Sequence, residues 1–148
     1  MEQMTLASVD IPWGYDCCFN ANCQLRDKCL HYQAYLLRTD ERAFGPAIYP
    51  DALKNGACKY FREAKPEKMA WGFTHLYDNI PPFRQSEARR SVHAYLGSGM
   101  GVYYRYHHGE RLLSPRKQQD ILNILAMYGS TDGVAFDHYV TAFDFSLK

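Results

Sequence analysis

The chain has 148 residues, of which 47% are apolar, 15% aromatic and 22% charged, and its formal net charge is +1. This high apolar content and low net charge exclude an intrinsically disordered chain. The apolar stretches fall far short of the roughly 18–20 residues that a membrane-spanning helix requires, so we expect no contact with a membrane.

The length suits one compact domain, because typical domains have about 100–150 residues. We therefore expect a single domain over residues 1–148, with a cysteine-rich segment at 13–60 and a helical part at 84–148. Residues 1–10 carry neither a basic start nor an apolar block, which predicts that no secretory signal is present. The expected location is the cytoplasm.

Cysteines crowd the first part of the chain. Four of the five lie within thirteen residues, and the full set is Cys17, Cys18, Cys23, Cys29 and Cys58. The reducing cytosol and the odd number argue against a disulfide framework. Two interpretations remain, namely thiolate ligation of a metal ion and separate packing of the thiols in the core and in loops.

The metal interpretation predicts a structural Zn²⁺ site, because zinc prefers four soft or borderline ligands in a tetrahedron. Five residues separate Cys17 from Cys23 and Cys23 from Cys29, which is wider than the familiar zinc knuckles. The expected ligands are Cys17, Cys23, Cys29 and Cys58, with Cys18 as a spare and His31 as a substitute. An iron–sulfur cluster held by the same cysteines is the alternative.

The first predicted helix spans Gln24–Arg38, where apolar residues recur at three- and four-residue steps and Asn22 is the expected cap. Cys29 would lie one turn into this helix, and Cys23 at its entrance. Asn55–Gly56 is typical of a turn, and it precedes Cys58. Two short strands are weaker expectations, at Lys59–Arg62 and Met69–Phe73.

Three further helices are expected in the second half. One runs from Ser86 to Gly97, where the glycine stops it. The next has Ser114 as its cap and Pro115 in its first position, and Gly129 closes it. The last, Gly133–Phe143, carries apolar residues at helical spacing and should pack antiparallel to the helix before it.

A strand is predicted at Val102–His107, because its residues alternate and several are aromatic. His108–Gly109 would turn the chain into a return strand at Arg111–Leu113. Together these elements predict a helix-dominated α+β fold, with about four helices and a short β-hairpin or small sheet.

A basic, aromatic segment at 84–117 suggests a second function. It holds seven Arg and Lys residues against two Glu, with tyrosines between them. Tyrosine faces beside guanidinium groups are typical of surfaces that bind single-stranded nucleic acid. The candidate contacts are Arg89, Arg90, Tyr103, Arg105 and Tyr106. The alternative is that the tyrosines pack against the core while the arginines pair with the acidic segment at 118–148.

No catalytic motif stands out. The glycine-rich stretch at 97–101 follows a predicted helix, whereas a dinucleotide-binding loop follows a strand. None of the six histidines forms a His-Glu-x-x-His pattern. The sequence therefore favours a non-enzymatic protein, with an iron–sulfur or thiol-dependent enzyme using the same cysteines as the alternative.

Four short stretches carry a resemblance to a known family. They are Cys-Leu-His-Tyr (29–32), Tyr-Tyr-Arg-Tyr (103–106), Gly-Glu-Arg-Leu-Leu-Ser-Pro (109–115) and Gln-Gln-Asp-Ile (118–121). With them, nearly the whole chain resembles a family of small proteins of unknown function from gut Bacteroidetes. The resemblance implies a cytoplasmic bacterial protein that stands alone as one domain. It brings no activity or site residue, so our functional expectation is a zinc-stapled module that contacts a protein partner.

Overall fold

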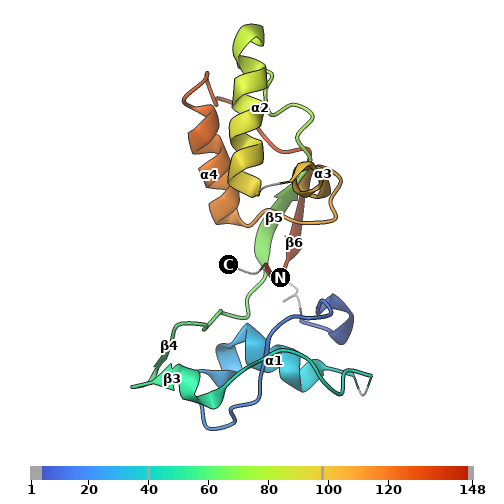
Figure 1. Ribbon diagram of the computed structural model, residues 1–148, viewed down its shortest axis with the longest axis vertical. Coiled ribbons are helices and arrows are strands. Elements are labelled where there is room, and N and C mark those ends of the chain that lie inside the picture. Colours follow the sequence, from blue (N-terminus) through green and yellow to red (C-terminus); the bar gives the residue numbers. More distant parts are fainter. Residues whose placement is uncertain (1–4, 40, 98, 147–148) are drawn as a thin grey trace. The chain divides into compact units, whose positions relative to one another are not determined.

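A computed structural model of the chain describes residues 5–39, 41–97 and 99–146 (Figure 1). The described residues form four α-helices and three two-stranded sheets, so the predicted α+β class is confirmed. None of the described helices is long and apolar enough to cross a membrane. The chain divides into two compact units. Unit 1 comprises the chain up to Pro66 and again from Phe145 on, and unit 2 comprises Glu67–Asp144.

Unit 1 consists of short elements joined by loops. In chain order they are the 3₁₀ turn η1 (Ser8–Asp10), β1 (Cys17–Cys18), the 3₁₀ turn η2 (Arg26–Lys28), α1 (Leu30–Leu37), β2 (Ala47–Ile48), the 3₁₀ turn η3 (Pro50–Ala52), β3 (Leu53–Lys54) and β4 (Ala57–Cys58). Strands β1 and β2 pair in parallel, and β3 and β4 form an antiparallel hairpin. The end of the chain returns to this unit, where the ring of Phe145 meets that of Tyr15 edge-on at 5.1 Å.

The helix predicted at Gln24–Arg38 is shorter than expected. It begins only at Leu30, because Cys29 is extended and pairs with Glu63 in an isolated antiparallel bridge. Asn22 therefore does not cap it. The Asn55–Gly56 turn is confirmed, since both residues have the positive φ angles, 53° and 77°, that a tight two-residue hairpin requires. Lys59–Arg62, a predicted strand, has no strand structure.

Unit 2 combines three helices with one sheet. Its elements are β5 (Glu67–Trp71), α2 (Pro82–Leu96), α3 (Met100–His107), α4 (Pro115–Leu125) and β6 (His138–Ala142). Helices α2 and α4 lie side by side, and β5 pairs antiparallel with β6 (Figure 1). The apolar core of the chain lies in this unit, with Val92, Leu113, Ile121 and Leu125 among its fully buried members.

Helices α2 and α4 lie where the sequence predicts helices, although α2 begins earlier, at Pro82 instead of Ser86, and α4 ends at Leu125, four residues before the expected stop at Gly129. It stops before Gly97, as predicted. In α4 the side chain of Ser114 accepts a hydrogen bond from Lys117 N at 3.3 Å, and Pro115 occupies the first turn. The strand expected at Met69–Phe73 corresponds to β5.

Three predicted elements of unit 2 are wrong. Val102–His107 belongs to helix α3, because Tyr103 and Tyr106, three residues apart, are the members that enter the core. The helix expected at Gly133–Phe143 is instead strand β6, whose five residues form a ladder with β5. Leu113 makes only an isolated bridge to Ala70, so no return strand forms at Arg111–Leu113.

Candidate metal centre

The two neighbouring cysteines of β1 point in different directions. Successive side chains of a strand alternate between its two faces. The Cys17 thiol donates to the carbonyl oxygen of Tyr15 at 3.7 Å, whereas Cys18 lines a small cavity with three other cysteines. The structure therefore brings Cys18 to the cysteine group, and Cys17, a predicted ligand, does not line the cavity.

Cys23 and Cys29 reach the same cavity from the loop and turn that precede α1. Cys29 is held by its bridge to Glu63, which is flanked by hydrogen bonds from Leu30 N to Arg62 O and from Ala64 N to Lys28 O, both 2.7 Å. These bonds tie the start of α1 to a strand-like segment after β4. The bridge thus sets the position of the only buried cysteine among the described residues.

Cys58 arrives from the β3–β4 hairpin. Lys54 pairs with Ala57 and Leu53 with Cys58, so the tight turn places Cys58 at the end of the ladder. Three separate segments, β1 with its following loop, the start of α1 and the hairpin, therefore supply four thiols to one place. All five cysteines of the chain are free thiols.

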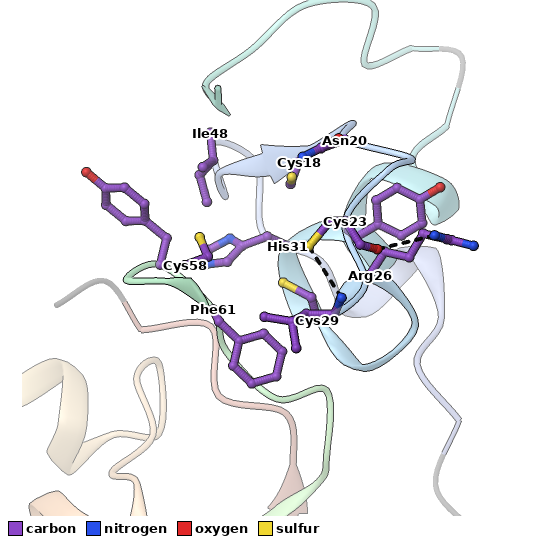
Figure 2. A pocket seen from close by; sticks show the side chains of 12 residues that line it. Cys18, Asn20, Cys23, Arg26, Cys29, His31, Ile48, Cys58 and Phe61 are labelled. Carbon is purple, nitrogen blue, oxygen red and sulfur yellow. Dashed lines mark hydrogen bonds between the residues drawn. The ribbon is translucent and has the colours of Figure 1, made fainter. Parts of the chain in front are cut away.

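Figure 2 shows these four side chains around the cavity, which we call the cysteine pocket and which Cys18, Cys23, Cys29 and Cys58 line. Its volume is about 30 Å³. In the described part of the chain no three His, Cys, Asp or Glu side chains are close enough to hold a metal ion as they stand. A metal would therefore require the thiols to draw together.

Backbone amides donate hydrogen bonds to two of these sulfurs. Leu25 N donates to the sulfur of Cys23 at 3.4 Å, and the amide of Asn20 donates to that of Cys18. In both cases the donor lies two residues after the cysteine. Such a bond stabilises the ionised form of a thiol, which is the form that binds metals.

Burial and, to a smaller degree, the other three thiols of the pocket raise the pKa of Cys18. The Asn20 amide opposes the effect of burial, and Cys29, Cys23 and Cys58 raise the pKa further. Burial is the largest of these causes, so desolvation is the main reason that the Cys18 thiol stays protonated. Cys17 stands in different surroundings, because burial raises its pKa while Arg38 and Arg42 lower it.

His31, the predicted substitute ligand, lines the cysteine pocket but is already engaged. Its Nδ1 donates to the carbonyl oxygen of Asp16 at 2.6 Å, and its ring stacks on Tyr15 with centroids 4.8 Å apart. Burial lowers the pKa of His31, and the carbonyls of Asp16 and Tyr60 act in the opposite direction. The ring therefore serves as a wall of the pocket that joins α1 to the segment before β1.

The residues proposed for nucleic-acid contact are distributed over α2 and α3. Arg89 and Arg90 are exposed on α2, and Arg105 is exposed on α3. Tyr103 and Tyr106 are both 5% exposed, and Tyr103 shares a 3.0 Å hydroxyl–hydroxyl hydrogen bond with Tyr77. Their ring faces are not available for stacking on bases. Tyr104, at 46%, is the exposed tyrosine of α3.

Sequence reasoning selected Cys17, which does not line the pocket, ahead of its neighbour Cys18, which does, and it did not consider the amides of Asn20 and Leu25. One signal was present, since Cys18 and Cys23 are separated by four residues, the upper limit of a zinc knuckle. Which of two adjacent cysteines faces the pocket depends on the pairing of β1 with β2, thirty residues away in the sequence. No local pattern indicates that pairing.

Comparison with known proteins agrees with the resemblance seen in the sequence. A profile of DUF6078, a family of unknown function, matches residues 1–145. No curated protein and no solved structure matches the chain. A Bacteroidetes origin stays a prediction, because the family match does not bear on it. Since the match covers nearly all of the chain, the protein belongs to the DUF6078 family.

Proposed function

We propose that unit 1 is a zinc-binding module in which Cys18, Cys23, Cys29 and Cys58 hold one structural Zn²⁺. The observation that carries the proposal is the convergence of four free thiols, from three segments of the chain, on one cavity. Four protein ligands leave no open position on the ion, which is the arrangement of structural and not of catalytic zinc.

The sparse core of unit 1 supports this role. Its described part contains six buried residues, against seventeen in unit 2. Small units with little apolar burial usually need disulfides or metals for stability. A zinc ion would join the β1 loop, the start of α1 and the β3–β4 hairpin, and so replace the cross-links that free thiols do not make.

The pocket size favours a single ion over an iron–sulfur cluster. Its volume of about 30 Å³ exceeds the ~10–15 Å³ that a cavity needs to hold one water molecule, so one Zn²⁺ ion fits in it. An iron–sulfur cluster brings several iron and sulfide atoms and needs a larger space. Zinc–sulfur bonds of about 2.3 Å would draw the four thiolates inward around one ion.

A structural ion would lie inside unit 1 and leave its surface free. We propose that this surface contacts a protein partner. Three of its aromatic side chains are at least 70% exposed, namely Trp13, Phe44 and Tyr49. Exposed aromatic residues are enriched at protein–protein interfaces. This recognition role requires unit 1 to be folded and therefore depends on the metal.

Elemental analysis of the untagged protein tests the metal site, with two adjacent cysteines as a matched pair. We expect one zinc per chain in the wild type and in Cys17→Ser, and loss of zinc in Cys18→Ser. If the analysis finds iron and acid-labile sulfide in place of zinc, the site holds an iron–sulfur cluster. Metal-free wild-type protein, purified without chelator, or equal loss in both variants, would refute the proposed ligand set.

A further inference from the structure

Strand β6 has an open edge. Within the described residues β6 pairs with β5 alone, whereas β5 is flanked on its other side by the bridge between Ala70 and Leu113. Four of the five residues of β6 are exposed, including Tyr139 and Val140, each at 42%. The outward N–H and C=O groups of such a strand can pair with another strand.

This edge lacks the features that usually prevent pairing. Natural edge strands are protected by charged residues, prolines or bulges. The sequence His-Tyr-Val-Thr-Ala of β6 has no Asp, Glu, Lys, Arg or Pro, and its ladder with β5 is regular over all five residues. Its β-branched and aromatic residues favour the strand conformation.

Local contacts fix the start of β6. At its start the ring of His138 stacks on Trp71 with centroids 4.0 Å apart. Just before it, Asp137 N donates to Gly72 O at 3.1 Å, and the Asp137 carboxylate accepts from Thr74 Oγ1 at 2.6 Å. A partner strand would therefore meet an edge that is already ordered, which lowers the entropic cost of association.

The edge is also complementary to itself. A two-fold axis at Val140 would place Val140 opposite its own copy, Tyr139 opposite Thr141 and His138 opposite Ala142. Because Met69 lies opposite Val140 across the β5–β6 ladder, one apolar row would run through four strands. No like charges face each other, and aromatic–β-branched pairs are favourable across strands.

We propose that two copies of this chain associate through antiparallel pairing of their β6 strands about Val140, which joins two β5–β6 sheets into one of four strands. A five-residue edge buries less area than a standard stable interface. The dimer therefore forms at high protein concentration and dissociates on dilution. The proposal is independent of the metal site, because β6 belongs to unit 2.

Sedimentation velocity over a concentration series from about 5 to 500 µM tests the pairing, because mass action then shifts the monomer–dimer balance. We expect the wild type to become dimeric, and Val140→Lys to stay monomeric since it would place two ammonium groups opposite each other. Met127→Lys is the matched control, because it adds the same charge at a 72% exposed site of unit 2 outside the strand and should dimerise like the wild type.

Hydrogen exchange of the 138–142 amides supplies a second readout on the wild type alone, which keeps the test valid even if Val140→Lys does not fold. We expect their exchange to slow several-fold as protein concentration rises. A wild type that stays monomeric, exchange that is independent of concentration, or a dimer that Val140→Lys leaves intact would each overturn the proposal. In the last case the two copies associate through a surface other than β6.

Discussion

At the scale of a single residue, the carboxylate of Asp137 anchors the segment that leads into β6. It accepts hydrogen bonds from the backbone and the hydroxyl of Thr74, at 3.1 and 2.6 Å. Burial alone would raise the pKa of Asp137, but the Thr74 bonds and the nearby His107 and His75 outweigh it and lower that pKa. A carboxyl whose folded pKa is depressed adds stability above its unfolded pKa and loses it as the pH falls through the folded value.

We therefore expect the free energy of unfolding of unit 2 to fall between about pH 4 and pH 2, and less steeply in Asp137→Asn. The difference should stay below about 1 kcal/mol because the group is partly solvated. Urea unfolding in a Trp13→Phe background, where Trp71 remains as the only tryptophan, measures it. Asp132→Asn, an exposed carboxyl in the same loop, is the control, and an equal effect of both variants would contradict the role of Asp137.

Both the backbone conformation and the packing at position 109 favour glycine. Its φ is +82°, and an added Cβ would lie 2.9 Å from the indole of Trp71. We expect Gly109→Ala to destabilise unit 2 by about 2–3 kcal/mol, from backbone strain and overpacking. Gly133→Ala separates the two terms, because Gly133 also has a positive φ of +72° but no heavy atom within 4 Å of the added carbon. Equal destabilisation in urea unfolding would show that the indole contact costs nothing.

At the scale of elements, α4 shows how far local signals determine structure. Ser114 is buried and caps the helix by accepting from Lys117 N. We expect Ser114→Ala to lower the free energy of unfolding by about 1 kcal/mol, and Ser114→Thr, which keeps the hydroxyl cap, to retain most of it. Chemical denaturation measures both. A stable Ser114→Ala protein would mean that packing alone sets the start of this helix.

Elements with strong end signals were those the sequence predicted well. Ser114 and Pro115 define α4, and Asn55–Gly56 defines the β3–β4 turn. By contrast, the aromatic 102–107 segment suits a strand or a helix by composition, and the core decided for a helix by accepting Tyr103 and Tyr106 on one face. Residues 138–142 became a strand because β5 offered a free edge. These two outcomes depend on residues far away in the sequence.

The candidate metal centre follows the same division. Composition predicted the crowding of thiols. Turn chemistry predicted that the Asn55–Gly56 turn presents Cys58. The sequence did not predict that Cys18 and not Cys17 faces the pocket, because this depends on the parallel pairing of β1 with β2. The engagement of His31 Nδ1 by the Asp16 carbonyl was equally invisible, since the two residues are fifteen positions apart.

At the scale of the whole molecule, the two units differ in what holds them together. Unit 2 has a continuous apolar core, from Ala70 to Phe136, that needs no cross-link. Unit 1 has few buried side chains, and its segments meet at the cysteine pocket. If zinc joins those segments, its binding free energy is part of the folding free energy of unit 1, because an unfolded segment offers no preformed site.

A zinc chelator should therefore act on one unit only. In the full chain we expect chelation to accelerate amide hydrogen exchange at least ~10-fold across residues 17–63, through local unfolding, and to leave the core amides of α2 and α4 protected. Cys18→Ser should exchange like the chelated protein even without chelator, and Cys17→Ser like the untreated one. The same loss of protection should follow acidification, since protons compete with the metal for the thiolates. Uniform acceleration in both units would mean that the chain unfolds as one body, and unchanged exchange in unit 1 would mean that the thiols stabilise it without a metal.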